Sequence, residues 1–369
     1  MRRSWIEVDL GVLGSNIRAL QKGLDDGPSV IFVVKSDAYG HGAVPIARRA
    51  YDCGVTWFGV AYIDEALDLR RSLDKPGILV MGVVEPGDVQ TLIYHNITPI
   101  VASLQHGQAL AKVAAAQGQR LRVHLKIDTG MGRLGVPWED GAEAYAELHA
   151  LPGLEITGLC THFAKVETED PAEARLQVER FKQVDAARQK VDDRPILRHV
   201  SSSRALLFYE EWDFDAVRPG IALYGYGAVD AGVRAHTRPF LEWKSHVTQV
   251  KPLAAGSPVG YYGTYVTERD TQLAVVSVGY TDGFLRTLSN RGFVLVGGKR
   301  CPVVGRVSMN WLTVDLGPDA DVSVGDEVVL LGRQGEESIW AGELAQMCKT
   351  IPYEILTNID PRTERRYLG

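Results

Sequence analysis

Residues 31–42 read IFVVKSDAYGHG, an apolar run that ends in Lys35 and passes into a turn bounded by glycines. The run predicts a buried strand over 31–35. Functional groups of parallel sheets and barrels gather where strands end, so this strand places an amine at such an end. A single lysine more often marks the exit of a chain into water. A function for Lys35 therefore depends on what the ends of the other strands carry.

Seven further apolar runs follow, separated by stretches with helical periodicity. They cover residues 55–61, 77–82, 97–102, 121–127, 155–160, 196–200 and 216–224. The clearest helix signal begins at Asp170-Pro171, and its apolar stripe runs from Ala174 to Val191. Strand and helix alternating eight times over roughly 225 residues is typical of an α/β protein with a (β/α)8 TIM-type barrel. A doubly wound open sheet is the alternative.

The pattern changes near residue 235, where closely spaced apolar runs replace the alternation. They cover residues 243–250, 273–279, 293–296, 303–307, 312–316 and 327–331. Gly297-Gly298 predicts a hairpin turn, and residues 341–349 predict one short helix. The sequence therefore predicts a barrel domain over 1–234 and a mostly β domain over 235–369.

Composition excludes several classes of protein. The 369 residues are 45% hydrophobic and 23% charged with a net charge of -6, which argues against a nucleic-acid partner. No apolar run reaches the roughly 18 residues of a membrane span, and Glu7 and Asp9 interrupt any signal-peptide core. The four cysteines lie far apart without a C-x-x-C pair, so neither a zinc site nor a disulfide framework is expected. We expect a cytoplasmic protein without metal or membrane partners.

Polar clusters follow four of the predicted strands, where a barrel keeps its active site, and a fifth cluster lies within the last predicted strand. They are Lys35, DTGMGRLG at 128–135, Thr161-His162, Ser201 to Ser203, and Arg218-Pro219-Gly220. A lysine with hydroxyls, glycines and a helix start nearby is the set required to bind pyridoxal 5'-phosphate. There is no G-x-G-x-x-G after the first strand and no P-loop sequence, so a nucleotide site is not predicted. The triplet Asp128-Thr129-Gly130 occurs once, whereas aspartic-protease chemistry needs two carboxylates.

Eight short motifs, in order and across almost the whole chain, resemble those of alanine racemases. They are VVKSDAYGHG, HLKIDTGMGRLG, CTHFA, RPGIALYG, VGYYGTY, SVGYTDGF, GRVSMN and IPYE. Each is weak alone, so their common order carries the resemblance. It implies a pyridoxal-phosphate-dependent homodimer of barrel-plus-β subunits that interconverts L- and D-alanine. The product would supply cell-wall peptidoglycan, with alanine breakdown as the other role.

Matched residue by residue, the resemblance implies two bases on opposite faces of the substrate. Lys35 would form the Schiff base with the cofactor and serve one face. Tyr261, supplied by the partner subunit, would serve the other. Arg218 would contact the pyridine nitrogen, with His162 beside it.

Further matched positions imply how phosphate and substrate are bound. The phosphate group would be held by Tyr39, Ser203, Tyr353 and the backbone of Gly220 and Ile221. Arg133 and the backbone of the partner subunit's Met309 would receive the substrate carboxylate. Lys126 matches a lysine that is often carbamylated and orients this arginine, and Tyr280 matches the entrance corridor.

Three residues depart from the family pattern. Asn310 stands where the family usually has Asp, Ser202 where it has Asn, and Tyr262 where it has Gly. The first two leave a broader or serine-preferring racemase as an alternative. Tyr262 is a second candidate base, although the register of VGYYGTY favours Tyr261. A non-catalytic pyridoxal-phosphate carrier or regulatory protein, or a decarboxylase of related fold, are alternatives of other classes.

Overall fold

The computed structural model describes residues 4–25, 27–167, 169–227 and 233–369. The chain divides into two compact units, each described here by itself. One comprises Leu13–Ala38 and Ala43–Arg238, and the other Met1–Val12, Tyr39–Gly42 and Pro239–Gly369. The chain's first strand and a four-residue segment after Lys35 thus belong to the second unit. A boundary after residue 234 stays a prediction.

The first unit contains a closed ring of parallel strands. Each strand pairs with the next, β5 pairs with β6, and β10 pairs with β2 to close the ring. The strands are β2 Ser29–Val33, β3 Trp57–Val60, β4 Gly77–Val80, β5 Thr98–Val101, β6 Leu121–Asp128, β8 Leu154–Cys160, β9 Leu197–Ser202 and β10 Ala216–Arg218. The two-residue strand β7, Val136–Pro137, is added to the outside of β6. The predicted (β/α)8 barrel is confirmed, and the open sheet is excluded.

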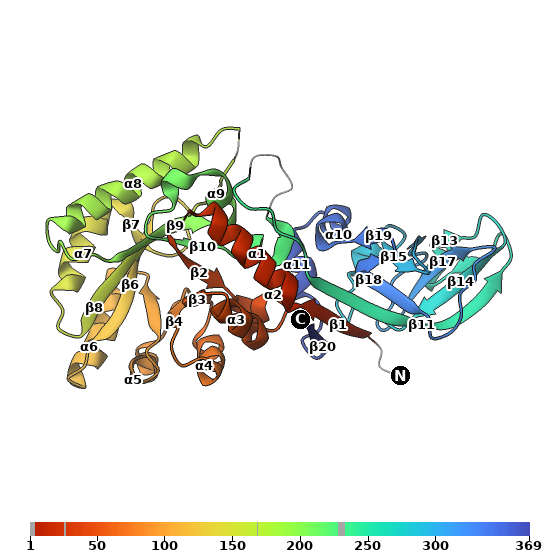
Figure 1. The fold of residues 1–369 in the computed structure, drawn as a ribbon, viewed down its shortest axis with the longest axis horizontal. Coiled ribbons are helices and arrows are strands. Elements are labelled where there is room, and N and C mark those ends of the chain that lie inside the picture. Colours follow the sequence, from red (N-terminus) through yellow and green to blue (C-terminus); the bar gives the residue numbers. More distant parts are fainter. Residues whose placement is uncertain (1–3, 26, 168, 228–232) are drawn as a thin grey trace. The chain divides into compact units, whose positions relative to one another are not determined.

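Helices alternate with these strands and lie on the outside of the ring (Figure 1). They are α1 Leu10–Gly23, α3 Ala43–Asp52, α4 Ile63–Ser72, α5 Val89–Tyr94, α6 Leu104–Ala116, α7 Gly141–His149, α8 Ala172–Gln189 and α9 Ser203–Phe208, with short turns η1 Pro86–Asp88, η2 Trp138–Asp140, η3 Glu210–Trp212 and η4 Ala222–Tyr226. Helix α8 buries Ala174, Val178 and Phe181, as its stripe predicts. It ends at Gln189, so Val191 lies beyond it and is exposed.

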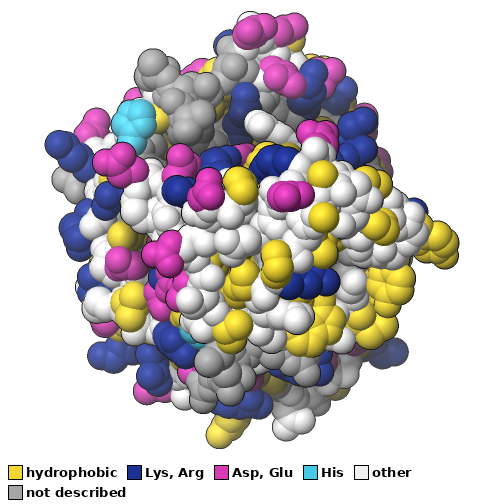
Figure 2. Space-filling model, turned by 90° about the vertical axis from the view of Figure 1, so that its right-hand side faces the viewer, with side chains coloured by type: hydrophobic (Ala, Val, Ile, Leu, Met, Phe, Trp, Pro, Cys, Tyr) yellow, Lys and Arg dark blue, Asp and Glu magenta, His cyan; other side chains and the backbone are white. Residues whose placement is uncertain are grey.

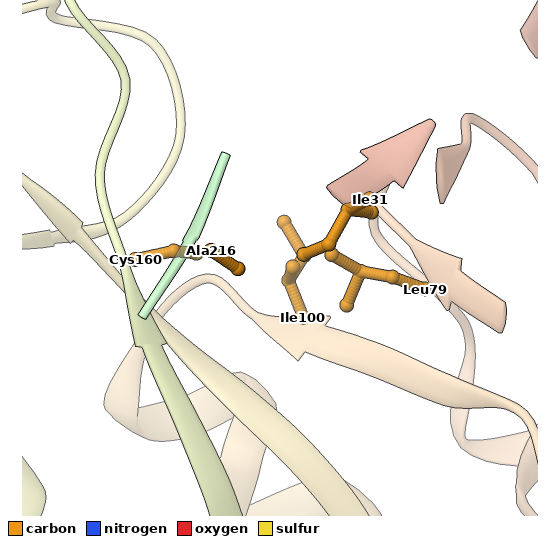
Figure 3. Close-up of a cluster of buried hydrophobic side chains, with 5 residues drawn as sticks. All are labelled: Ile31, Leu79, Ile100, Cys160 and Ala216. Atoms are coloured by element: carbon orange, nitrogen blue, oxygen red, sulfur yellow. The ribbon is translucent and has the colours of Figure 1, made fainter. Parts of the chain in front are cut away.

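An apolar layer fills the middle of the barrel. Figure 3 shows this cluster, to which separate strands contribute Ile31, Leu79, Ile100, Cys160 and Ala216. Side chains alternate between the two faces of a strand. Because Ile100 is paired with His124, the same inner face of β6 carries Arg122, His124 and Lys126. The buried His124 and Lys126 therefore lie inside the barrel beside its apolar layer, whereas Arg122 is exposed.

The second unit is built around the 13-residue strand β11, Leu241–Leu253. This strand pairs with β1, β14 and β18 within a sheet of order β16-β15-β18-β11-β1-β20. The unit contains β1 Ser4–Asp9, β12 Pro258–Val259, β13 Tyr265–Val266, β14 Thr271–Val276, β15 Phe293–Val296, β16 Lys299–Pro302, β17 Leu312–Gly317, β18 Glu327–Gln334, β19 Glu337–Ile339 and β20 Glu364–Leu368, with α10 Ala341–Cys348, α11 Pro352–Thr357, η5 Tyr261–Gly263 and η6 Arg286–Leu288. The mostly β second domain is thereby confirmed.

Several local predictions were wrong for identifiable reasons. Residues 303–307 form no strand, because Gly305 at φ 77° turns the chain and only Val303 makes an isolated bridge. Strand β10 ends at Arg218 rather than near residue 224, since Pro219 offers no N–H for the ladder. Strand β2 ends at Val33, so Lys35 begins the following turn.

Candidate active site

Lys35 opens a left-handed turn, α2 Lys35–Tyr39, directly after β2. Ser36, Asp37, Ala38 and Tyr39 all have φ between 52° and 54°. Side-chain-bearing residues pay roughly 1–2 kcal/mol each for this conformation, and such strain concentrates at functional sites.

Two carboxylates hold the turn in place. Glu65 of α4 accepts a hydrogen bond from the Ser36 N–H at 2.6 Å. Asp37 accepts one from the Ala43 N–H at 2.7 Å. Both donors are backbone groups, so the carboxylates fix the course of the chain on either side of the turn. The position of Lys35 is therefore set by contacts that were not predicted from the sequence.

The environment of Lys35 favours its neutral amine. Burial lowers the pKa of Lys35, and the nearby Arg133 cation lowers it further, while Glu65 opposes this effect. A neutral amine carries the free electron pair that attacks a carbonyl carbon. Lys35 is thus suited to form a covalent bond to an aldehyde.

Strand β6 and the loop that follows it supply two further basic side chains, Lys126 and Arg133. Lys126 is only 8% exposed, and burial, together with Arg218 and Arg133, lowers its pKa, whereas Cys160 acts in the opposite sense. In the loop, Asp128 Oδ1 accepts hydrogen bonds from the N–H groups of residues 130, 131 and 132 at 2.8–3.2 Å. This arrangement shapes the glycine-rich loop that carries the exposed Arg133.

Arg218 lies in the barrel with almost all its donors used. Its NH1 group donates to the ring Nδ1 and the carbonyl of His199, at 2.7 and 2.6 Å. Its NH2 group donates to the carbonyls of Thr161 and Val200, at 2.7 and 2.9 Å. A guanidinium has five N–H donors. The Nε–H of Arg218 is therefore the donor left for a ligand.

A chain of neutral imidazoles extends from Arg218. Because a guanidinium cannot accept, His199 Nδ1 is the acceptor and its Nε2–H donates to His124 Nδ1 at 2.8 Å. Burial, followed by the charges of Arg122 and Arg218, lowers the pKa of His124 to about 3. Burial and Arg218 also lower the pKa of His162 to about 2 and hold that of His199 well below its usual value. All three rings are neutral near pH 7.

This chain predicts a loss of stability in mild acid. Each histidine has a lower pKa in the folded chain than its unfolded value near 6.5, so the unfolded chain binds more protons below that pH. The stability that these neutral histidines contribute to the folded chain is fully present above pH 6.5 and is lost as the pH falls toward 3. Between pH 6.5 and 4.5 the free energy of unfolding should fall by about 2–3 kcal/mol for His124 alone, measured by urea titration. His124→Asn cannot titrate and should lose less; an equal loss would contradict the prediction.

Ser203 begins α9 at the end of β9 and contacts the loop after β10. Its Oγ accepts hydrogen bonds from the N–H groups of Gly220 and Ala222, at 2.9 and 3.2 Å. The hydroxyl hydrogen of Ser203 is thus left to donate. Ile221 follows Gly220 and is buried.

The second unit brings the two predicted phosphate-binding tyrosines together. Tyr39 is buried, and its ring centroid lies 5.5 Å from that of Tyr353 on α11. Burial raises the pKa of Tyr353, so its hydroxyl keeps its proton near neutrality. The phenol of Tyr353 is therefore a neutral donor.

The candidate second base lies in the turn η5. Tyr261 is 65% exposed and Tyr262 is 88% exposed. Tyr262 has φ 64° at the position where a glycine was expected, and the Arg306 guanidinium lies 4.7 Å from its ring centroid. The stacking of Tyr262 on its own subunit distinguishes it from Tyr261.

Met309 and Asn310 lie in a loop that is hydrogen-bonded to the segment carrying Tyr280. The Tyr280 N–H donates to the Ser308 carbonyl at 3.1 Å, and the Thr281 hydroxyl donates to the Met309 carbonyl at 2.7 Å. Asn310 Nδ2 donates to the same Thr281 hydroxyl at 3.0 Å. Three predicted site residues therefore share one network.

The candidate residues fall into two groups, one in each unit. The barrel unit holds Lys35, Lys126, Arg133, His162, Ser203, Arg218, Gly220 and Ile221. The other unit holds Tyr39, Tyr261, Tyr280, Met309, Asn310 and Tyr353. Sequence reasoning missed Glu65 and Gln177, which position the loops, and gave Thr129 no positioning role. Gln177 had a signal, as a polar residue on the apolar stripe of α8.

Neither a metal-binding cluster nor a membrane-spanning helix is found in the described parts of the chain. Within residues 4–25, 27–167, 169–227 and 233–369, no group of three or more His, Cys, Asp or Glu side chains could hold a metal ion. No helix in these ranges is long and apolar enough to cross a membrane. The cysteines are free. The cationic set at the carboxyl ends of the barrel strands lies where enzymes of the (β/α)8-barrel class keep their active sites.

Comparison with known proteins identifies the family. Models of the alanine racemase N-terminal and C-terminal domains match residues 8–228 and 240–367. The chain belongs to the alanine racemase family and is therefore an isomerase. It is 42% identical to the alanine racemase of Symbiobacterium thermophilum, over 100% of this chain and 98% of the relative.

Solved structures of the same enzyme agree with this assignment. Alanine racemase from Streptomyces lavendulae, described as a D-cycloserine producer, superimposes with a TM-score of 0.94 at 37% identity, covering 100% of this chain and 98% of that one. Alanine racemase from Bartonella henselae with covalently bound pyridoxal phosphate gives a TM-score of 0.89 at 28% identity, covering 100% of both chains.

Proposed function

We propose that this enzyme interconverts L- and D-alanine with pyridoxal 5'-phosphate bound through Lys35. The observation that carries the proposal is the lowered pKa of Lys35 within a barrel mouth that also contains Arg133, Lys126 and Arg218. The amine suits an aldehyde, and the cations suit the carboxylate and phosphate groups of substrate and cofactor. The Bartonella henselae relative with covalently bound pyridoxal phosphate supports the same cofactor.

The donor set fits this cofactor at three points. Lys35 Nζ would hold its aldehyde carbon. The free hydroxyl hydrogen of Ser203 would donate to the phosphate, with the phenols of Tyr39 and Tyr353 and the backbone of Gly220 and Ile221 as further donors. The Nε–H of Arg218 would donate to the pyridine nitrogen. Because a guanidinium retains its protons, Arg218 would leave that nitrogen unprotonated.

Inversion of the stereocentre at Cα would use two bases, which lie on opposite faces of the substrate. When bound, pyridoxal phosphate withdraws electrons from the Cα–H bond of the substrate and so acidifies it. Lys35 Nζ would be released when the substrate amine takes its place on the cofactor aldehyde, and the free amine would then remove or return the Cα proton on one face. Tyr261 Oη of the partner subunit would do so on the other. A proton taken from one side and returned on the other gives the opposite enantiomer.

Substrate orientation falls to the loop after β6. Arg133 would bind the carboxylate in bidentate fashion, helped by the backbone of the partner subunit's Met309. Neutral His162 would lie against Arg218 without adding positive charge to the network. The lowered pKa of Lys126 makes a neutral amine available, which carbamylation requires, and a carbamate there would orient Arg133.

The exposed position of the second base supports a homodimer. Figure 2 shows the face of the molecule that carries β13, β14 and β17, and hydrophobic side chains gather along one side of this view. Large exposed apolar side chains of the β unit include Tyr261, Tyr262, Met309 and Trp311. Patches of this kind mark interaction surfaces. We propose that a second copy of the chain covers them, that Tyr280 lines the entrance, and that the cytoplasmic enzyme supplies D-alanine for peptidoglycan.

The substrate preference is tested by comparing alanine with serine. Asn310 is the observation that favours serine, since its amide stands where the family usually has a carboxylate. We expect L-alanine to be racemised faster than L-serine by about 10–100-fold, because a small apolar pocket discriminates against an added hydroxyl only to that extent. Circular dichroism of each amino acid over time measures both rates. Faster serine turnover would establish the serine-preferring alternative instead.

A further inference from the structure

Gln177 is a buried amide on the apolar stripe of α8. Its side chain is 4% exposed and lies in sequence between the buried Ala174 and Phe181. A polar side chain in such a place needs hydrogen-bond partners. It finds them in loops of the barrel mouth rather than within its own helix.

The amide group of Gln177 joins two loops. Its Nε2 donates to Thr129 Oγ1 at 3.1 Å, in the loop after β6, and to the His162 carbonyl at 3.3 Å, in the loop after β8. Its Oε1 accepts from the Ala164 N–H at 3.0 Å. One side chain therefore contacts the loop that carries Arg133 and the loop that carries His162.

These contacts continue toward Arg218. Thr129 Oγ1 lies 2.8 Å from Thr161 Oγ1, and the carbonyl of Thr161 accepts a hydrogen bond from Arg218 at 2.7 Å. Arg180, one turn along α8, donates to the Thr129 carbonyl at 2.8 Å. Helix α8 thus holds the β6 loop at both the side chain and the backbone of Thr129.

We propose that Gln177 is a positioning residue that fixes Arg133 relative to His162 and Arg218. The inference rests on the proposed function, in which Arg133 binds the substrate carboxylate while Arg218 contacts the cofactor. The distance between substrate and cofactor must then be fixed. Gln177 sets this distance because it joins the loop after β6 to the loop after β8. A displaced Arg133 would bind the substrate carboxylate more weakly in the ground state and in the transition state alike, which raises KM more than it lowers kcat.

The hydrogen bonds of Gln177 to the two loops explain why an amide stands at this position, and the stability of α8 does not. A long apolar side chain would match the stripe formed by Ala174, Val178 and Phe181 at least as well. It would leave the Ala164 N–H without its acceptor and release the His162 carbonyl. The effect of losing the amide should therefore fall on substrate binding.

The test compares Gln177→Met with two other variants of α8. Gln177→Met keeps the length of the side chain, and we expect it to raise KM for alanine about tenfold while kcat changes less than about threefold and the absorbance of bound pyridoxal phosphate persists. Val178→Ala, at a buried neighbour, should lower the thermal stability without changing KM. Gln183→Met, at an exposed position of the same helix, should change neither.

Thr129 provides a second test that does not alter α8. Thr129→Val removes the hydroxyl that joins Gln177 to Thr161 and should raise KM, whereas Thr129→Ser keeps the hydroxyl and should restore it. An unchanged KM in both Gln177→Met and Thr129→Val would overturn the inference. Should Gln177→Met not fold, the Thr129 pair decides alone.

Arg133→Ala separates this inference from the proposed function. A raised KM in Arg133→Ala with an unchanged KM in Gln177→Met and Thr129→Val would overturn only the role of Gln177. An unchanged KM in Arg133→Ala would overturn the proposed carboxylate site, and the role of Gln177 with it.

Discussion

Replacement of Lys35 by alanine is expected to abolish racemisation, with a loss on the order of 10³-fold or more. The variant lacks both the amine that would bind the cofactor aldehyde and the base on one face of the substrate. Burial lowers the pKa of Lys35, so its amine is more reactive toward an aldehyde than the amine of an exposed lysine. The rate of change of optical rotation from either enantiomer, and the visible absorbance of the protein with pyridoxal phosphate, measure the two losses.

Lys112→Ala is the matched control for this substitution. Lys112 is exposed on α6 and lies outside the candidate site. It should leave both rate and absorbance unchanged. A Lys35→Ala variant that racemised alanine at the wild-type rate would exclude Lys35 from the chemistry.

Tyr261→Phe is expected to reduce racemisation by about 10²–10⁴-fold in both directions. Each direction needs a base on both faces, so loss of one hydroxyl blocks both. Exchange of the Cα proton should nevertheless persist for one enantiomer in heavy water, because Lys35 still serves its own face. Nuclear magnetic resonance of L- and D-alanine in heavy water follows exchange and inversion separately.

Tyr262→Phe is the control, because it retains the ring that stacks on Arg306. It should keep most of the activity if Tyr261 is the base. Loss of activity in Tyr262→Phe with retention in Tyr261→Phe would reverse the assignment. The carrier alternative requires that neither the wild type nor Tyr261→Phe exchanges the Cα proton, and released carbon dioxide would identify a decarboxylase.

The barrel could be predicted because each of its strands is an apolar run bounded by turn signals. The misplaced elements have local causes that periodicity does not reveal. Strand β10 spans three residues before Pro219, and strands β12 and β13 have two residues each, too few to show alternation. Strand β1, which pairs with the distant strands β11 and β20, was not predicted.

Much of the candidate site could also be predicted, since its residues stand at strand ends or in quoted motifs. The contacts that position them could not. The left-handed turn over residues 36–39 contains no glycine, so nothing in its composition indicates positive φ. Gly42 has φ 95°, and a Cβ there would also collide with the hydroxyl oxygen of the distant Tyr367. Glu65 acts through a backbone group of another segment, which no local pattern identifies, and the polar Gln177 on the apolar stripe of α8 does not reveal its partners.

The most direct test of the central claim is borohydride reduction of the enzyme in the presence of pyridoxal phosphate, followed by peptide mass mapping. The account predicts a visible absorbance that is lost on reduction and a pyridoxyl-phosphate group attached to the peptide containing Lys35. A colourless protein without a reducible linkage, or a label confined to another lysine, would contradict it.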